Sequence, residues 1–255
     1  MSWEILHDLD NLLRTGDAVI SSAPTREFGS SLDALTDGVQ AIPCRFLGVQ
    51  DREIVITFPG GITGVGMVSI HDLRVDGDDY TGVTITGLTE PVTFTREEIE
   101  KSLGSVAWSG HASVSELLIR IDPVGSNSAW SLAEICLGSP WGAVSISEAG
   151  DSPARRVEFS RTWNTVANGP WRTKLAEPVQ TYVLSLAAGF ERDVLEEYLR
   201  RSDGGARPVV FKPDRSQPKA VHGHLGDEFS GAIGLGGVWE EGAQLVFTEG
   251  MRALK

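Results

Sequence analysis

The sequence contains little cysteine, and that shortage excludes one class of protein. Among 255 residues there are two cysteines, Cys44 and Cys136. Two cysteines are too few for a disulfide scaffold. The chain also lacks a CxxC motif, so zinc held by thiolates is not expected. Each cysteine stands in an apolar run, and we therefore predict two buried free thiols.

Long apolar runs and basic residues are also scarce. No run approaches the roughly 20 residues that span a bilayer. The first residues, MSWEILHDLDNLL, have neither a basic region nor a cleavage site, so no signal peptide is expected and synthesis in a cytoplasm is predicted. There are 22 Lys and Arg against 35 Asp and Glu, a net charge of −13. A protein with this negative charge repels the phosphate backbone, so a nucleic-acid partner is not expected. Membrane insertion is not expected either, because no apolar run is long enough.

Glycine is abundant, and short apolar segments alternate with turns. The 29 glycines and 12 prolines favour many short strands. The sequence predicts a mainly β protein with two antiparallel β-sandwich or barrel domains and one or two short helices. We expect an N-terminal segment at 1–16, a first domain at 17–140 and a second at 141–255. The Gly/Pro turn at 138–142 marks the boundary.

Three segments have helical patterns. Residues 3–14 place leucines at helical spacing, although a terminal segment can also pair as a strand. Residues 95–103 begin with Thr-Arg-Glu-Glu, a capping-box pattern. Residues 190–201, FERDVLEEYLRR, carry an apolar stripe with arginines at the end. In the strand-like run 130–137, strict alternation predicts Trp130, Leu132, Glu134 and Cys136 on one face.

Catalytic signatures are absent from the sequence, so we expect neither an enzyme nor a cofactor. His222 and His224 are weak metal candidates, because residues two apart on a strand share a face. Asp227 or Glu228 would supply a third ligand. Histidines on a surface strand are commoner than metal ligands, so no metal is predicted. The acidic turn at 76–79 is interpreted in the same way, as solvated rather than as a calcium site.

The first half resembles the discoidin-like, galactose-binding jelly roll. The resemblance rests on SSLDALTDG at 30–38, REIVITFPGGITGVGMVSIHDL at 52–73, GVTITG at 82–87 and WSLAEICLG at 130–138. It implies that loops at one end of a sandwich could contact a host glycan or a partner protein. The candidate residues in those loops are Asp72, Asp76, Asp78, Trp108 and His111.

The second half is similar to distal-tail or baseplate ring proteins of long-tailed bacteriophages. The similarity rests on RPVVFKPD at 207–214, HGHLG at 222–226 and LVFTEG at 245–250. It implies a structural component of the virion tail tip or baseplate. Its partners would be copies of itself in a ring, trimer or hexamer, and the tube, tape-measure, hub and fibre proteins. Of seven tryptophans, we expect one or two of Trp141, Trp163, Trp171 and Trp239 at an interface.

Two other functions stay open at this point. A carbohydrate-binding module would recognise host-surface glycan through the loops of the first domain. A glycan-active enzyme would depend on a pair of carboxylates, which no sequence feature singles out. Because one sandwich fold hosts many functions, the resemblance alone does not transfer sugar binding.

Overall fold

A computed structural model shows a mainly β chain that divides into two compact units, which confirms the predicted fold class. It describes residues 2–39, 42–47, 53–76, 80–123, 129–145, 154–158, 161–166, 169–174, 179–185, 197, 200–203, 206–226 and 244–250. The first unit comprises residues 1–145 and 209–222, and the second comprises 146–208 and 223–255. The first unit is therefore built from two separate stretches of sequence.

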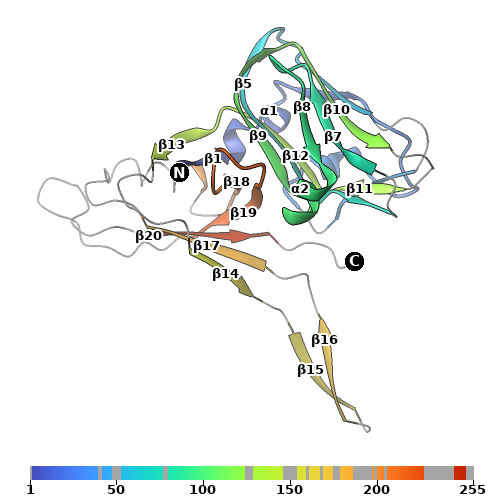
Figure 1. Ribbon diagram of the computed structural model, residues 1–255, viewed down its shortest axis with the longest axis vertical. Helices are drawn as coiled ribbons and strands as arrows, with labels where there is room; N and C mark the ends of the chain where they lie inside the picture. The colour runs from blue at the N-terminus through green and yellow to red at the C-terminus, as the bar shows by residue number, and fades with distance from the viewer. Residues whose placement is uncertain are drawn as a thin grey trace, which may run out of the picture. The chain divides into compact units, whose positions relative to one another are not determined.

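Two antiparallel sheets enclose the main core of the first unit (Figure 1). One has the order β2-β4-β10-β7-β8 and the other β12-β5-β9. Their bounds are β2 Val19–Ser22, β4 Glu53–Thr57, β5 Thr63–His71, β7 Tyr80–Thr86, β8 Val92–Thr95, β9 Val106–Val114, β10 Glu116–Pro123 and β12 Glu134–Gly138. In β4, Ile54 and Ile56 are buried while their neighbours are half-buried, so one face of this strand lines the core.

A third small sheet completes this sandwich. It has the order β3-β11-β6, from β3 (Cys44–Phe46), β11 (Trp130–Leu132) and β6 (Arg74–Val75). Trp130 stacks on Phe46 with ring centroids 4.1 Å apart. A 3-10 helix, η2 (Leu32–Leu35), adds Leu35 to the core. Cys44 also lies there, and both cysteines are buried and free, as predicted.

The chain changes sheets at Ala133, and this corrects the predicted alternation in residues 130–137. Trp130 and Leu132 share the main core with Ile135 and Leu137, whereas Cys136 belongs to a different core cluster. The reason is the break between β11 and β12, where the Ala133 N–H bonds to the His71 carbonyl instead of continuing the ladder. Both faces of β12 are buried, because Ile135 and Leu137 face the main core and Cys136 faces the other cluster.

The other face of β12-β5-β9 is covered by strands from both ends of the unit's sequence. β1 (Ser2–His7) pairs with β13 (Trp141–Ser145) on one side and β18 (Pro208–Lys212) on the other. A second core lies between these strands and the sheet. It contains Leu6, Met67, Ala107, Cys136, Val210 and Ala220.

The predicted helix at 3–14 is wrong over its first part. Its first residues form β1, and only η1 (Asp8–Asp10) and α1 (Leu12–Thr15) are helical. Pairing on both edges buries Trp3, Ile5 and Leu6 almost completely, which a single amphipathic helix stripe would not do. The predicted helix at 95–103 is confirmed as α2 (Arg96–Lys101). Thr95 and Glu98 form the reciprocal capping box.

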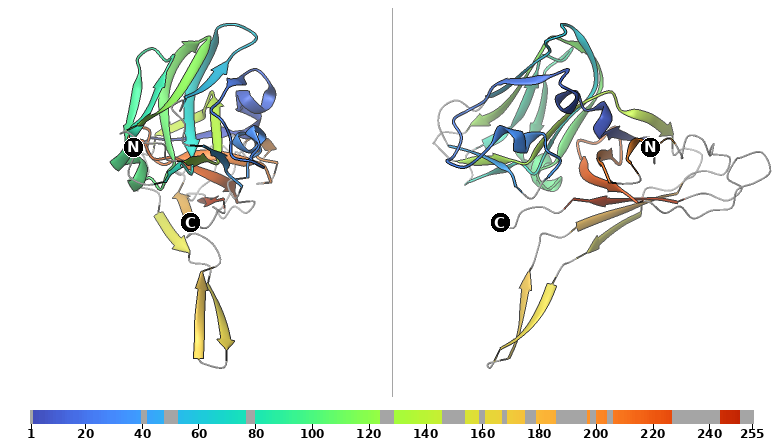
Figure 2. Two further views of the ribbon diagram at one scale, coloured as in Figure 1. Left: turned by 90° about the vertical axis from the view of Figure 1, so that its right-hand side faces the viewer. Right: turned by 180° about the vertical axis from the view of Figure 1, so that it is seen from behind.

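The second unit contains an antiparallel arrangement with the order β19-β20-β17-β14, from β14 (Ala154–Glu158), β17 (Val179–Ser185), β20 (Gln244–Glu249) and the part of β19 (Val221–Leu225) that begins at Gly223. β15 (Arg161–Val166) and β16 (Gly169–Lys174) form a separate two-stranded hairpin between β14 and β17 in the sequence. It extends beyond β14 and β17 as a narrow ribbon (Figure 2). Most of the predicted helix at 190–201 lies outside the described residues, but Glu197, Arg200 and Arg201 are helical.

Candidate functional site

A cluster of buried polar side chains lies where β5 and β12 meet the start of β19. Met67, Ser69 and His71 alternate along β5 on the face opposite the main core. Glu134 and Cys136 occupy the equivalent face of β12, and His222 joins them from β19. Ser69, His71 and Glu134 are 0% exposed, and Cys136 and His222 are 4% exposed. The cluster is thus sealed from solvent.

Glu134 is the most unusual member, because a carboxylate is rarely buried without compensation. It lies directly opposite His71 across the β5–β12 pair. Its Oε2 accepts the backbone N–H of Gly38 at 2.9 Å. Its Oε1 is buried and has no hydrogen-bond partner among the described residues. Burial raises the pKa of Glu134 to about 8, against the opposing charge of Arg14.

Cys136 and His222 approach Glu134 closely. A carboxylate oxygen, the Cys136 Sγ and an imidazole nitrogen of His222 all lie within 4.8 Å of one another. Burial, reinforced by the charge of Glu134, holds the pKa of the Cys136 thiol well above its usual value. These three groups are a thiol, a carboxyl and an imidazole, which are the three side-chain types that bind transition metals most often.

His71 is the second imidazole of the cluster. Its ring centroid lies 5.3 Å from that of His222. Its Nε2 is 3.0 Å from the Ser69 Oγ, and its Nδ1 is buried with no hydrogen-bond partner among the described residues. Burial, followed by the charge of His222, holds the pKa of His71 well below 6.5, so the ring is neutral at pH 7.

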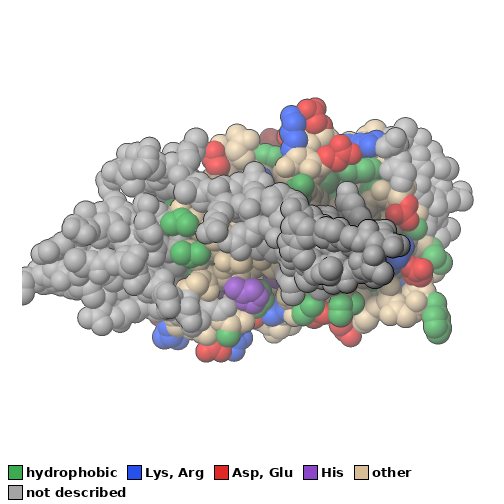
Figure 3. Space-filling model, turned by 90° about the horizontal axis from the view of Figure 1, so that it is seen from below, with side chains coloured by type: hydrophobic (Ala, Val, Ile, Leu, Met, Phe, Trp, Pro, Cys, Tyr) green, Lys and Arg blue, Asp and Glu red, His purple; other side chains and the backbone are tan. Residues whose placement is uncertain are grey.

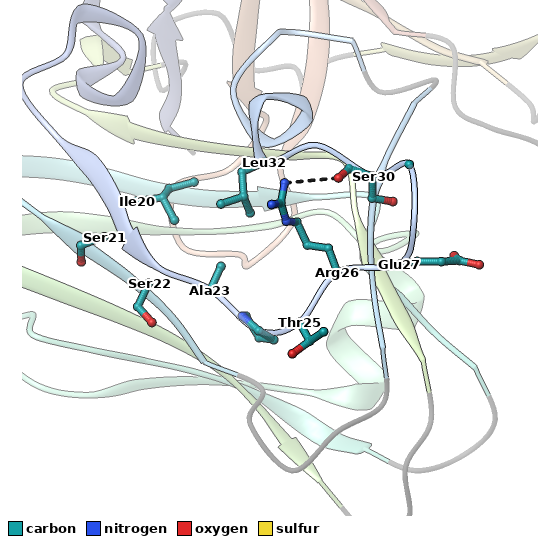
Figure 4. Close-up of a pocket in the computed structure, with 11 residues that line it drawn as sticks. Ile20, Ser21, Ser22, Ala23, Thr25, Arg26, Glu27, Ser30 and Leu32 are labelled. Atoms are coloured by element: carbon teal, nitrogen blue, oxygen red, sulfur yellow. Dashed lines mark hydrogen bonds between the residues drawn. The ribbon is translucent and has the colours of Figure 1, made fainter.

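An open groove lies on the surface of the same unit, along the segment between β2 and η2 (Figure 4). Its volume is about 540 Å³. The lining residues are Ile20, Ser21, Ser22, Ala23, Pro24, Thr25, Arg26, Glu27, Gly29, Ser30 and Leu32. Arg26 Nη1 donates to the Ser30 carbonyl at 3.2 Å, and Glu27 pairs with Arg45 at 2.8 Å. Because the lining has no aromatic ring, the groove lacks the stacking platform that sugar sites favour.

The acidic residues predicted to contact a glycan are in different surroundings. Asp72 is 2% exposed and has a φ of 53°. Its carboxylate accepts bonds from Arg74 Nε at 3.0 Å and Nη2 at 2.7 Å. This bidentate pair holds the turn between β5 and β6 and leaves Asp72 little access to a ligand. Asp76 is exposed, and Asp78 lies outside the described residues.

Trp108 and His111 are not in a loop as predicted, because both belong to the long strand β9. The pairing of β5 with β9 shifts register between Val65 and Met67, so Gly110 and His111 form a bulge. The Trp108 ring crosses Gly110, where an added Cβ would come within 2.4 Å of it. Trp108 therefore packs along its own strand and against the main core, while His111 is exposed.

The two histidines predicted as weak metal candidates differ in their exposure to solvent. His222 is buried in the cluster, whereas His224 is exposed. Asp227 and Glu228 lie outside the described residues. Sequence reasoning missed Glu134 and Cys136 as neighbours of His222. The sequence feature that could have revealed this cluster is the presence of polar residues within otherwise apolar strands, in SIH at 69–71 and AEICL at 133–137.

On the face in Figure 3, acidic and basic side chains are scattered in small groups. No helix among the described residues is long and apolar enough to cross a membrane. In comparisons with known proteins, the chain matches no family model and no curated protein.

Proposed function

We propose that the protein is a structural component of a bacteriophage virion tail, at the tail tip or baseplate, and that it works by assembling with copies of itself and with other tail proteins. The β15–β16 hairpin carries this proposal. Among the described strands, β15 and β16 pair only with each other, over six residue pairs from Arg161–Lys174 to Val166–Gly169. Two-stranded ribbons are marginally stable alone in water, so this one is expected to gain a partner on assembly.

The hairpin offers a physical route to that assembly. Each outer edge of a two-stranded ribbon presents backbone N–H and C=O groups that another strand can pair with. Trp163 lies in β15 and Trp171 in β16, and tryptophan is enriched at protein interfaces. The occupant that we propose is a second copy of this chain. Head-to-tail contacts between identical copies close into rings, the form of the proteins that the second half resembles.

Exposed apolar residues of the first unit support an assembly role. Phe28 is 105% exposed and stands between two groove-lining residues, and Ile62 is 77% exposed. Large exposed apolar side chains are often covered by a partner. Tail proteins meet several neighbours, which suits a surface with more than one such feature.

Self-association tests the first part of the proposal. Sedimentation velocity should show concentration-dependent oligomers of the full chain, and replacement of residues 161–174 by an Asn-Gly turn should leave a monomer. Glu90→Ser, at an exposed position of the first unit that has no part in the proposed contact, is the surface control and should still associate. A full chain that stays monomeric at every concentration, or a shortened chain that associates equally well, would contradict assembly through the hairpin.

The virion assignment needs a separate measurement. Mass spectrometry of density-purified particles from a lysate of the source should find the chain at a few fixed copies per particle, in ratio to tail proteins. If the chain remains in the soluble fraction and is missing from particles, the tail proposal fails, whatever its state of association.

A further inference from the structure

The buried cluster on β5, β12 and β19 contains a set of ligand atoms that the assembly proposal does not use. The Glu134 carboxylate, the Cys136 thiol and the His222 imidazole bring donor atoms within 4.8 Å of one another. In a tetrahedral zinc site, bonds of roughly 2.0–2.3 Å place ligand atoms roughly 3.3–3.8 Å apart. The limit of 4.8 Å exceeds the upper end of this spacing by about 1 Å, which is the movement that binding would require.

An unsatisfied atom gives a second and independent observation. Glu134 is 0% exposed, and its Oε1 has no hydrogen-bond partner among the described residues. Native proteins rarely leave a buried carboxylate oxygen without a partner. The nearby cation Arg14 does not fill this role, because its own ion pair is with Asp8 at 2.5 Å. A bound cation would satisfy the orphaned oxygen.

We propose that this cluster binds one divalent transition-metal ion with the ligand preferences of zinc, through Glu134, Cys136 and His222, with His71 as the fourth ligand. His71 is assigned because its ring centroid lies 5.3 Å from that of His222 and its Nδ1 is buried without a partner among the described residues. The site needs no assembly partner, so it stands or falls separately from the virion proposal.

The donor set selects the class of ion. Thiolate and imidazole ligands favour zinc and related metals, whereas calcium and magnesium take oxygen ligands. One thiolate, one carboxylate and two neutral imidazoles also balance a charge of +2, which a buried site requires. Four protein ligands leave no open position, so the ion would have a structural role.

The position of the ligands shows what such an ion would hold together. Glu134 and Cys136 lie on β12, His71 on β5, and His222 at the end of the stretch 209–222. The ion would tie this late stretch of sequence to the sandwich formed by the first 145 residues. Metal binding of this kind contributes directly to folding stability.

Metal content and cobalt spectroscopy test the site in the tag-free full chain. Protein prepared without chelator should contain one equivalent of zinc. Chelator-treated protein titrated with Co²⁺ should develop a thiolate-to-cobalt charge-transfer band and the intense visible bands of tetrahedral cobalt. Zinc should raise the melting temperature saturably, as expected for an ion that binds the native state.

Two pairs of variants separate this site from unspecific binding. Cys136→Ala should abolish the charge-transfer band, whereas Cys44→Ala removes the other buried thiol and should leave the band intact. His222→Gln should weaken Co²⁺ binding by at least about tenfold. His224→Gln changes an exposed imidazole two residues away and should have no effect.

The outcomes that would overturn the proposal are equally specific. One is wild-type protein that binds no Co²⁺, and another is binding without the thiolate band. A third is the loss of the band in Cys44→Ala but not in the cluster variants. If Cys136→Ala fails to fold, the wild-type titration and the comparison of His222→Gln with His224→Gln still decide the question.

Discussion

The side-chain oxygen of Asn11 accepts the backbone N–H of Leu137, 126 positions away in the sequence, at 3.3 Å. The same oxygen accepts the N–H of Leu13 at 3.3 Å and so caps α1. Asn11 is 2% exposed, and its backbone also forms a bridge with Gly138. One amide thus fixes the turn after β1 to the end of β12.

Replacing the Asn11 side chain should show how much its hydrogen bonds contribute to the free energy of unfolding. Asn11→Ala loses a helix cap and leaves a buried N–H of Leu137 without its partner, so the free energy of unfolding should fall by about 2 kcal/mol. Thr15→Ala, at an exposed position of α1, should change it by less than about 0.5 kcal/mol. Urea denaturation of both variants provides the comparison. Equal losses would contradict a special role for Asn11.

Gly138 should not tolerate a side chain. A Cβ there would lie 2.0 Å from the backbone carbonyl oxygen of Asp10, an atom that cannot move aside cheaply. Gly138→Ala should therefore destabilise the chain by about 3 kcal/mol, at the upper end of overpacking costs. Gly60→Ala meets nothing within 4 Å and should be close to neutral. Thermal denaturation of the two variants tests this contrast, and a stable Gly138→Ala chain would refute it.

Lys212 should make the free energy of unfolding vary with pH in the alkaline range. Its ammonium group donates to the Ala107 carbonyl at 2.9 Å and lies 3.0 Å from the Ser109 Oγ. Burial lowers its pKa from 10.5 to about 8, although the charge of Glu4 opposes the shift. Between these two values the unfolded chain binds more protons than the native chain. The free energy of unfolding should therefore increase with pH across that window.

The size of this increase in unfolding free energy follows from the shift in the Lys212 pKa. The contribution of Lys212 should grow by about 3 kcal/mol between pH 8 and 10.5. Lys212→Met cannot titrate and should lack that increase, whatever its stability at pH 7. Denaturant unfolding at a series of pH values gives both curves. Parallel curves for the wild type and the variant would show that Lys212 keeps an ordinary pKa.

The capping box of α2 gives a fourth prediction. The Thr95 Oγ1 accepts the Glu98 N–H at 3.3 Å, and Glu98 Oε2 accepts the Thr95 N–H at 2.8 Å. Thr95→Ala should lower the free energy of unfolding by about 1 kcal/mol, and Thr95→Ser should retain most of it. Chemical denaturation measures both. A loss of the same size in the serine variant would point to the Thr95 methyl group instead of the hydroxyl.

Local patterns in the sequence predicted the features that depend on neighbouring residues. The mainly β class, the capped helix after Thr95 and the two buried thiols were all found. Each follows from turn residues, caps or apolar alternation within about ten positions. The virion role and the glycan alternative remain predictions, because neither the fold nor the comparisons test them.

The wrong predictions have one physical cause, which is the pairing of strands that lie far apart in the sequence. β1 has a helical apolar pattern, but pairing with β13 and β18 overrides it. Trp108 and His111 lie among small polar residues that suggest a loop, yet β9 pairs along its length with β5. The buried cluster escaped prediction for the same reason, since Glu134 and His222 meet only through sheets that the sequence does not specify locally.

The return of residues 209–222 to the first unit has a consequence for biosynthesis. A ribosome that has released residues 1–145 has not yet made β18, which pairs with β1. Until then, one edge of β1 and the apolar side chains of the second core have no cover from that strand. More than sixty further residues must be synthesised after residue 145 before β18 is available, so the sandwich of the first unit cannot close until then.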